Sequence, residues 1–543
     1  MSLASVNCRA QTGLNASPVH VEVNLGQGLP ALALVGLPAT VVKESKERVR
    51  AAIMNSGFEF PSGRITVNLA PADLPKEGGW FDLPIAVGIL LASQQIKSGG
   101  DHARLSSTEF YGELALSGEL KTTRGLLIAA VHATQAGHAL VVPQVNASEA
   151  NRAPGSVVHG ARSLLDVCAF IEGANALDSG VQLGPSAMVA RPDVTDPVDL
   201  THIHGQMQAK RALMIAAAGG HSLLFIGVPG SGKSTLARRL PGLLPSLNET
   251  EALEVAAIAS ASVAGFDARS FGLRPFRSPH HTASAASVVG GGPRARPGEI
   301  SLAHHGVLFL DELPEFERRV LEALREPLET GEVSVSRAAR SVQYPAAFQL
   351  IAAMNPCPCG YLGDERGTCH CTPEVVERYK RRISGPLLDR LDMQIDVPRV
   401  TTSDMFELKA AGADSRETAI LVKRARERQT VRQGVCNARL AIADVGRYCT
   451  PDERGLAVLK RATESLRLSA RGYHRVLRIA RTIADLVGEE RSSWDHIAEA
   501  IALRKLGRGP LSQVVATELL DAAHVSVAAP TSDRSTTLAR GGD

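Results

Sequence analysis

A glycine-rich segment near the middle of the chain constrains the fold more than any other feature of the sequence. It fits the phosphate-binding pattern G-x-x-x-x-G-K-[ST] and reads Gly227-Val228-Pro229-Gly230-Ser231-Gly232-Lys233-Ser234. The apolar run 223–226 before it predicts a buried strand, and residues 235–240 after it predict a helix. A strand, loop and helix in this order favour a working phosphate loop over a chance match. We therefore expect an α/β fold with a doubly wound parallel sheet.

The residue types of this loop predict a site for ATP and Mg²⁺. Its glycines let backbone amides curl around phosphate oxygens at the positive end of the next helix. We expect Lys233 to reach the β- and γ-phosphates, Ser234 to bind Mg²⁺, and Thr235 to belong to the same nucleotide contact.

A second element, residues 306–312, supports this assignment. Its apolar run ends in Asp311 and Glu312, and such a run suits a strand buried on both faces of a parallel sheet. Carboxylates at the C-terminal end of that strand lie where open α/β sheets bind ligands. We expect Asp311 to hold Mg²⁺ and Glu312 to polarise the attacking water, which predicts an ATPase.

Length and composition set limits for the rest of the chain. The chain has 543 residues, enough for roughly two to four domains. Its net charge is +3, from 59 basic and 56 acidic residues, so any contact with nucleic acid must be local. Eight cysteines without a secretory pattern predict a reducing, cytoplasmic environment, and we expect no membrane span.

Composition and periodicity divide the chain into five parts. Residues 1–183 mix strand-like and helical runs, residues 184–200 form a proline-rich linker, and residues 201–400 alternate helix and strand around the nucleotide motifs. Residues 401–510 show mainly helical periodicity. Residues 511–543 form a tail that we expect to be partly disordered.

With both nucleotide motifs placed, the chain resembles the YifB/ComM family of magnesium-chelatase-like AAA+ ATPases. The resemblance covers about residues 5–508 and rests on motifs at residues 36–38 with 44–50, 64–78, 274–281, 297–304 and 384–390. Val228 departs from the family, which commonly has Pro there. The resemblance implies a Lon-protease-like N-terminal domain, an AAA+ core and a helical lid.

The resemblance also assigns roles to three polar residues beyond the two nucleotide motifs. Asn355, at the end of another apolar run, is similar to sensor 1, which contacts the γ-phosphate or the attacking water. Arg390 is similar to an arginine finger, which stabilises the transition state in a neighbouring subunit. A salt bridge to an adjacent aspartate is the alternative for Arg390. Arg471 is similar to sensor 2, with Arg475 as its competitor.

A finger that acts on a neighbouring subunit requires a ring, and the family implies a homo-hexamer. The N-terminal domain is not expected to be a peptidase. Lon-type catalysis needs a Ser nucleophile and a Lys base, yet the matching run 75–82 has no Ser in reach. The position of the Lys base aligns with Leu127. We expect this domain to bind a partner or DNA, or to help build the ring.

Four clustered cysteines suggest a structural Zn²⁺ site. Cys357, Cys359, Cys369 and Cys371 lie close together in the sequence, and glycines at 360 and 363 allow the loop to fold back. The C-x-C spacing is tighter than usual, and His370 is a substitute ligand. Buried free thiols or a redox pair are the alternatives.

Residues 331–344 alternate polar and apolar side chains on both sides of a short turn, which predicts a β-hairpin. In this clade a hairpin before the sensor 1 strand faces the pore. Arg337 and Arg340 near its tip would form a basic collar suited to phosphate backbones, and a solvated tip is the alternative. The stretch 274–298 resembles the helix-2 insert, a second pore element, and we assign His280 and His281 to this loop rather than to a metal.

The resemblance implies a helicase that drives branch migration during homologous recombination, as in natural transformation. Single-stranded or branched DNA is the expected partner, with recombination proteins as further partners. A magnesium-chelatase motor subunit is one alternative, although such subunits normally lack the N-terminal domain and the cysteines. A protein-remodelling ATPase is the other, although its pore loop ordinarily carries an aromatic–apolar pair.

Overall fold

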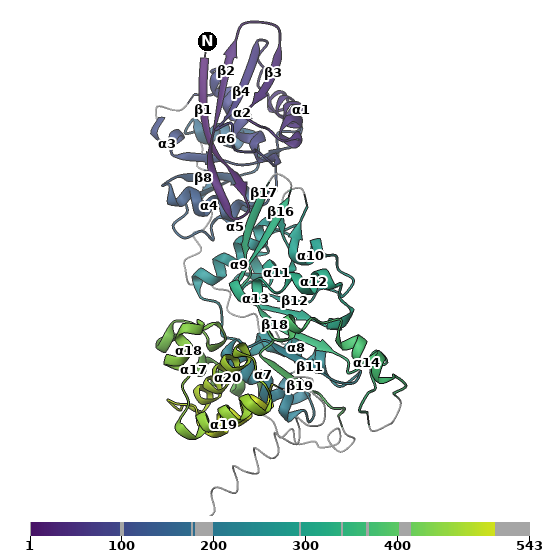
Figure 1. Cartoon of the computed structure of the whole chain (residues 1–543). Coiled ribbons are helices and arrows are strands. Elements are labelled where there is room, and N and C mark those ends of the chain that lie inside the picture. The colour runs from purple at the N-terminus through teal and green to yellow at the C-terminus, as the bar shows by residue number, and fades with distance from the viewer. Residues whose placement is uncertain are drawn as a thin grey trace, which may run out of the picture.

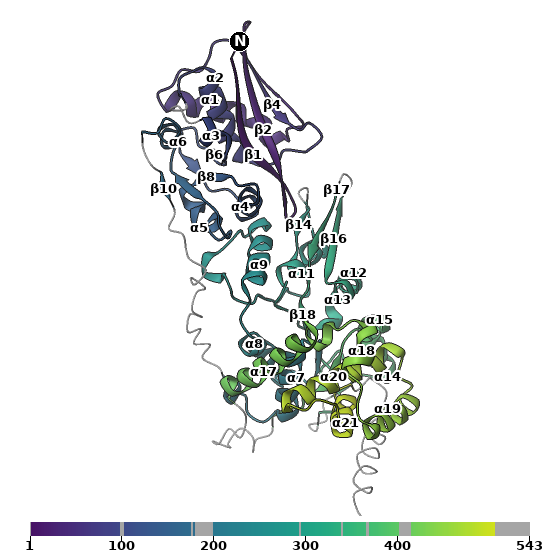
Figure 2. The ribbon, with the colours of Figure 1, turned by 90° about the vertical axis from the view of Figure 1, so that its left-hand side faces the viewer.

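The computed structural model describes residues 2–97, 102–174, 177–179, 199–292, 295–337, 340–364, 369–400 and 414–504. Nearly all of the predicted linker and the whole predicted tail lie outside the described residues, as does the start of the predicted lid. Figures 1 and 2 show the three described parts following one another along the long axis of the molecule.

The N-terminal part is built on an eight-stranded mixed sheet of order β10-β9-β8-β5-β1-β2-β4-β3. Its strands are β1 (Ser2–Thr12), β2 (Asn15–Gly26), β3 (Ala31–Val35), β4 (Arg64–Ala70), β5 (Thr108–Phe110), β8 (Ala139–Pro143), β9 (Val158–Ala161) and β10 (Asp178–Ser179). The ribbon β6 (Glu113–Leu114) and β7 (Leu120–Lys121) stands apart from it. The helices are α1 (Thr40–Asn55), α2 (Asp82–Ala92), α3 (His102–Ser106), α4 (Leu126–Gln135), α5 (Ala147–Ala150) and α6 (Leu164–Ile171).

The longest strands of this sheet form one antiparallel hairpin. β1 pairs with β2 over their full length, from Ser2 opposite Leu25 to Thr12 opposite Asn15. Alternate residues of β2 are buried against α2, because successive side chains of a strand point to opposite faces. The turn between β1 and β2 points towards the central part of the molecule (Figure 2).

The central part contains a five-stranded parallel sheet of order β12-β15-β18-β11-β19. Its strands are β11 (Leu223–Ile226), β12 (Phe276–Arg277), β15 (Val307–Leu310), β18 (Gln349–Met354) and β19 (Met393–Asp396). The helices are α7 (Met207–Gly219), α8 (Lys233–Leu243), α9 (Glu249–Ala261), α10 (Ala285–Val289), α11 (Glu299–Leu302), α12 (Arg318–Ala323), α13 (Pro327–Thr330), α14 (Pro373–Lys380) and α15 (Gly385–Leu388).

Continuous apolar runs form these strands because both faces of the sheet are covered. Val307 and Phe309 belong to one buried cluster, whereas Leu308 and Leu310 belong to the cluster on the other face. The predicted α/β class with a parallel sheet is confirmed.

Two small ribbons are added to this core. β13 (Gly290–Gly291) pairs with β14 (Arg296–Pro297), and β16 (Glu332–Arg337) pairs antiparallel with β17 (Arg340–Pro345). The predicted hairpin over residues 331–344 is thus confirmed, and it extends towards the N-terminal part (Figure 1).

The C-terminal part is helical, as its periodicity predicted. It contains α17 (Ser415–Gln433), α18 (Ile442–Tyr448), α19 (Glu453–Ser465), α20 (Ala470–Val487) and α21 (Trp494–Ala502). Helices α17 and α20 pack against α7, so this part covers one end of the parallel sheet (Figure 1). Among the described residues, no helix combines the length and apolar character that a membrane span requires.

Candidate active site

The phosphate loop connects β11 to α8 in the conformation that its glycines permit. Gly230 and Gly232 have φ angles of 77° and 91°, in the left-handed region that favours glycine. A Cβ atom at Gly227 would lie 2.2 Å from the carbonyl oxygen of Val397, so only glycine fits there. The loop therefore wraps around the N-terminal end of α8, where a helix attracts phosphate.

Lys233 and Ser234 project from the first turn of α8 towards the ends of the neighbouring strands. Nζ of Lys233 donates hydrogen bonds to the carbonyl oxygens of Gly227, at 2.7 Å, and Val228, at 2.9 Å. Burial lowers the pKa of Lys233, while the charges of Asp311 and Glu312 oppose that shift. Oγ of Ser234 donates to Oδ2 of Asp311 at 2.5 Å, which brings together the two predicted Mg²⁺ ligands. A hydroxyl and a carboxylate at this distance fit a Mg²⁺ site.

Asn355 follows β18 and completes this cluster. Its Oδ1 accepts a hydrogen bond from Nζ of Lys233 at 3.2 Å, so the predicted sensor 1 lies beside the phosphate loop. Glu312 has a φ of 52°, and its side chain lies 3.0 Å from Nδ1 of His281. The parallel sheet thus gathers the loop, both acidic residues and the asparagine at one edge.

The predicted finger and sensor 2 arginines share a carboxylate that sequence reasoning did not find. Arg390 lies 2.8 Å from Oε1 of Glu329, and Arg471 lies 3.3 Å from the same oxygen. Arg390 is 7% exposed and pairs with neither of the aspartates beside it in the sequence. Nothing in the local sequence of α13 indicates this role for Glu329.

Arg475 has a different environment from Arg471. It forms an ion pair with Asp392, which is 5% exposed and also accepts a hydrogen bond from the N–H of Ser222 at 2.9 Å. Burial opposes ionisation of Asp392, but Arg475 and His221 hold its pKa well below the usual range. Arg475 therefore anchors α20 to the sheet, whereas the side chain of Arg471 is 53% exposed. The assignment of Arg471 as sensor 2 stays a prediction.

The four predicted zinc ligands converge. Sγ of Cys357 lies 3.3 Å from that of Cys359 and 3.8 Å from that of Cys369, and all four sulfur atoms lie within 4.8 Å of one another. Four sulfurs bound tetrahedrally to Zn²⁺ are about 3.8 Å apart, given a Zn–S bond of about 2.3 Å. The cluster therefore fits Zn²⁺, and the four cysteines form this ligand group without His370.

The pKa values of the cysteine thiols also favour a metal site. A hydrogen bond from the N–H of Tyr361 and contact with Cys357 lower the pKa of Cys359 to about 6. A backbone hydrogen bond at Cys359 lowers the pKa of Cys371, but hydrogen bonding to the sulfur of Cys359 and burial outweigh it and raise this pKa to about 11. A second thiolate beside the first is costly, and a divalent cation would remove that cost.

The cysteine loop packs directly against the nucleotide site. A Cβ atom at Gly360 would lie 2.8 Å from the ring of Pro229 and 3.8 Å from Cγ of Asn355. Gly360 and Gly363 have φ angles of 88° and 79°, so both take the folded-back conformation that the sequence predicted. The cysteine loop therefore limits where the phosphate loop can lie.

Arg337 and Arg340 are opposite each other in the register of β16 and β17, at the turn end of the hairpin. Their side chains lie outside the described residues, so their role in binding DNA stays a prediction. One face of the hairpin is apolar, and Val342 and Tyr344 pack beneath the turn at Gly13. The N-terminal part thus contacts the hairpin directly.

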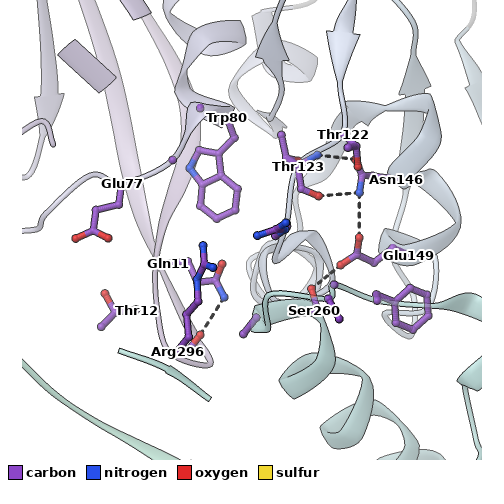
Figure 3. Close-up of a pocket in the computed structure, with 18 of the residues that line it drawn as sticks. Gln11, Thr12, Glu77, Trp80, Thr122, Thr123, Asn146, Glu149, Ser260 and Arg296 are labelled. Atoms are coloured by element: carbon purple, nitrogen blue, oxygen red, sulfur yellow. Dashed lines mark hydrogen bonds between the residues drawn. The ribbon is translucent and has the colours of Figure 1, made fainter. Parts of the chain in front are cut away.

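A cavity of about 560 Å³ lies between the N-terminal and central parts (Figure 3). Trp80, from the run 75–82, lines it and is 5% exposed, and Ser260 of α9 donates a hydrogen bond across the interface to Glu149 at 2.5 Å. Leu127 is fully buried in α4. Neither Lys nor Cys is among the described residues that line the cavity.

A cluster of Glu254, His304 and His305 was not anticipated. Both imidazoles contact Oε2 of Glu254, at 3.1 and 2.7 Å. Nδ1 of His304 accepts the N–H of Ala347, so Nε2 of the neutral ring carries the proton that faces Glu254. Burial and His305 lower the pKa of His304 to about 4. His304 is therefore a donor that ties α9 to the start of β15, and its nitrogen is not open to a metal.

Known proteins are similar in sequence to nearly the whole chain. Three family profiles match: "Subunit ChlI of Mg-chelatase" over residues 21–146, "Magnesium chelatase, subunit ChlI" over residues 199–405, and "Magnesium chelatase, subunit ChlI C-terminal" over residues 412–504. The chain is 47% identical over 509 residues to competence protein ComM of Haemophilus influenzae, which covers 94% of this chain and 98% of that protein.

The chain is also similar to two further relatives. The uncharacterised protein YifB of Escherichia coli is 46% identical over 515 residues, covering 94% of this chain and 98% of its own length. The magnesium-chelatase 38 kDa subunit of Rhodobacter capsulatus is 27% identical over 363 residues, covering 62% of this chain and 95% of its own length.

Proposed function

Because this chain belongs to the YifB/ComM family of magnesium-chelatase-like AAA+ proteins, we propose that it is an ATP-driven hexameric ring motor acting on DNA. The motor would be a helicase that promotes branch migration in homologous recombination, as in natural transformation. The family implies ATP hydrolysis. The observation that carries the proposal is the cluster of Lys233, Ser234, Asp311 and Asn355 at one edge of the parallel sheet.

Each residue of this cluster has a task that follows from its position. Lys233, held beside the loop carbonyls, would neutralise the β- and γ-phosphates. Ser234 and Asp311 would hold Mg²⁺, which supplies further neutralisation of the phosphate oxygens. Glu312 would accept the proton of the attacking water, and Asn355 would orient that water or the γ-phosphate.

Two arginines support the proposed ring. Arg390 and Arg471 contact Glu329 in the isolated chain, and we propose that assembly exchanges this carboxylate for the phosphates of a neighbouring subunit. A hydrolysis site completed by a second copy makes activity depend on assembly. The predicted boundaries of the N-terminal domain, AAA+ core and lid remain part of this proposal.

Contact with DNA is assigned to the hairpin because it offers a polar surface beside a basic turn. Ser334, Ser336 and Gln343 are exposed on the face opposite the buried valines. Arg337 and Arg340 at the turn would contact phosphate without reading bases. The magnesium-chelatase alternative is less well supported, since the chelatase relative matches only 62% of this chain.

A branch-migration assay tests the proposal. The full chain is mixed with a labelled synthetic four-way junction, ATP and Mg²⁺, and the conversion to two duplexes is followed on a native gel. Wild-type protein should convert the junction only with hydrolysable ATP, and Lys233→Ala should not convert it. An active ATPase that leaves the junction intact would contradict the helicase proposal and favour the alternative of a protein-remodelling ATPase.

A further inference from the structure

The cavity between the N-terminal and central parts is lined by two buried polar groups that the protein does not use. Nε1 of Trp80 and Oγ1 of Thr123 have no hydrogen-bond partner within the described part of the chain. Their residues are only 5% and 8% exposed, and Figure 3 shows the indole of Trp80 pointing into the cavity. A buried polar group without a partner destabilises a fold, so two of them at one cavity indicate that a ligand completes it.

The structure fixes the positions of both groups. The indole of Trp80 packs edge-on against the rings of Phe81 and Tyr111, with centroid separations of 6.3 and 5.9 Å. On the other wall, Oδ1 of Asn146 accepts the N–H of Thr123 at 3.0 Å, and Nδ2 of Asn146 donates to the carbonyl oxygen of Thr123 at 2.8 Å. Little ordering is therefore left for a ligand to impose, which favours binding.

The acidic side chains at the cavity already have partners. Glu149 accepts a hydrogen bond from Ser260 at 2.5 Å, and burial raises its pKa, which opposes its negative charge. Glu113 lies close enough to Arg48 for their charges to interact. Glu77 is engaged as well. These three carboxylates are thus not the groups that lack a partner.

Arg124 adds a positive charge to the same wall as Thr123. It lines the cavity, is exposed and forms no ion pair among the described residues. An indole N–H and a guanidinium can only donate hydrogen bonds, so the missing partner must supply acceptors. Carboxylate and phosphate groups supply acceptor oxygens together with the negative charge that arginine pairs with.

We propose that this cavity binds a small organic anion whose carboxylate or phosphate oxygens accept hydrogen bonds from Trp80 and Thr123 and pair with Arg124. Its volume of about 560 Å³ is typical of a small-molecule site. The described lining contains no Cys, His or Lys, and the hydroxyl of Ser260 is donated to Glu149. This lining offers no nucleophile with an imidazole or amine base, so we assign binding and no reaction. The inference does not depend on the proposed ATPase.

A bound anion would strengthen the contact between the two parts. Trp80 and Thr123 belong to the N-terminal part, whereas Tyr344 of β17 and Ala295 beside β14 line the cavity from the central part. Oη of Tyr344 donates a hydrogen bond to the carbonyl oxygen of Ala295 at 2.9 Å, so this wall is also held together. The ligand would therefore lie between the N-terminal part and the β16–β17 hairpin.

The test uses Trp80 as its own reporter. The chain has two tryptophans, so Trp494→Phe leaves Trp80 as the single one in an otherwise complete protein. This reporter protein is titrated with citrate and, separately, with inorganic phosphate, against sodium chloride at equal ionic strength. At least one of the two anions should change the Trp80 emission saturably, with a Kd of about 1 mM or lower. The anion that acts distinguishes a carboxylate ligand from a phosphate ligand.

Variants of the reporter protein separate this site from other anion sites. Arg124→Ala and Thr123→Val should each weaken binding about tenfold, the worth of one hydrogen bond to a charged group. Lys121→Ala is the control and should bind like the reporter protein, because the Lys121 side chain is 55% exposed and pairs with Glu119 at 3.0 Å. Trp80→Phe keeps an aromatic ring without the N–H, and calorimetry should show a similar loss of affinity.

Two results would overturn the inference. The first is a Trp80 emission that neither anion changes up to about 10 mM. The second is an Arg124→Ala variant that responds with the affinity of the reporter protein, since the anion would then bind elsewhere, for example at the phosphate loop. Circular dichroism of each variant confirms that the chain is folded when binding is measured.

Discussion

The contact between the cysteine loop and the phosphate loop gives a prediction that the structure makes quantitative. In Gly360→Ala, the new Cβ would lie 2.8 Å from the Pro229 ring, whereas in Gly363→Ala it would meet no atom of the described residues within 4 Å. Both glycines have positive φ angles, of 88° and 79°. The two substitutions therefore share a backbone penalty and differ in one contact.

The backbone penalty is about 1–2 kcal/mol of unfolding free energy for each variant. Carbon atoms prefer separations of about 3.5–4.0 Å, so Gly360→Ala must also push the loops apart by about 0.7 Å or more. Such overpacking costs roughly 1–3 kcal/mol more. A phosphate loop displaced this far should lose about one hydrogen bond to the phosphates and raise the KM for ATP on the order of tenfold.

The assay is denaturant unfolding together with steady-state ATP hydrolysis, on protein with its metal content checked. Gly363→Ala should lose stability but keep the wild-type KM, whereas Gly360→Ala should lose more stability and bind ATP more weakly. Equal KM values for the two variants would refute the claim that the cysteine loop positions the phosphate loop.

Three further predictions address the metal, the DNA surface and the lid. Metal analysis of purified protein should find about one Zn²⁺ per chain, and a folded, metal-free protein would end the zinc proposal. The double variant Arg337→Ala with Arg340→Ala should bind single-stranded DNA more weakly, and its affinity should depend less on salt. The exposed control Lys460→Ala should bind like the wild type. Unchanged affinity of the double variant would show that the hairpin does not bind DNA. Arg475→Ala should cost about 3 kcal/mol in denaturant unfolding, because Asp392 would stay buried without its arginine. The low pKa of Asp392 stabilises the fold above its unfolded pKa of about 3.9, and this stabilisation is lost as pH falls through the folded pKa. The unfolding free energy of Arg475→Ala should therefore change less at acidic pH than that of the wild type. Matching unfolding curves for the two proteins would contradict this assignment.

The features predicted best from sequence were those set by neighbouring residues. The run 223–226 and the loop after it carry their own strand, turn and helix signals, and the structure places β11 at those residues. The hairpin over 331–344 and the helices of the C-terminal part have equally local periodicities. The hairpin strands β16 and β17 together span residues 332–345, within one residue of the predicted limits.

The contacts missed by sequence reasoning depend on residues far apart in the chain. Glu329 joins Arg390 and Arg471 only because α13, the segment after α15 and the start of α20 meet in space. His281 was correctly assigned to a loop, but its contact with Glu312 requires the parallel pairing of β12 with β15. A short helix or a loop histidine carries no local signal for such a partner.

The rate of ATP hydrolysis by the full chain, measured with and without forked DNA over a range of protein concentrations, tests the central claim most directly. The account predicts that the rate per chain rises with assembly, increases further with DNA, and falls to background in Lys233→Ala. A monomer that hydrolyses ATP at its full rate, unaffected by DNA, would contradict it.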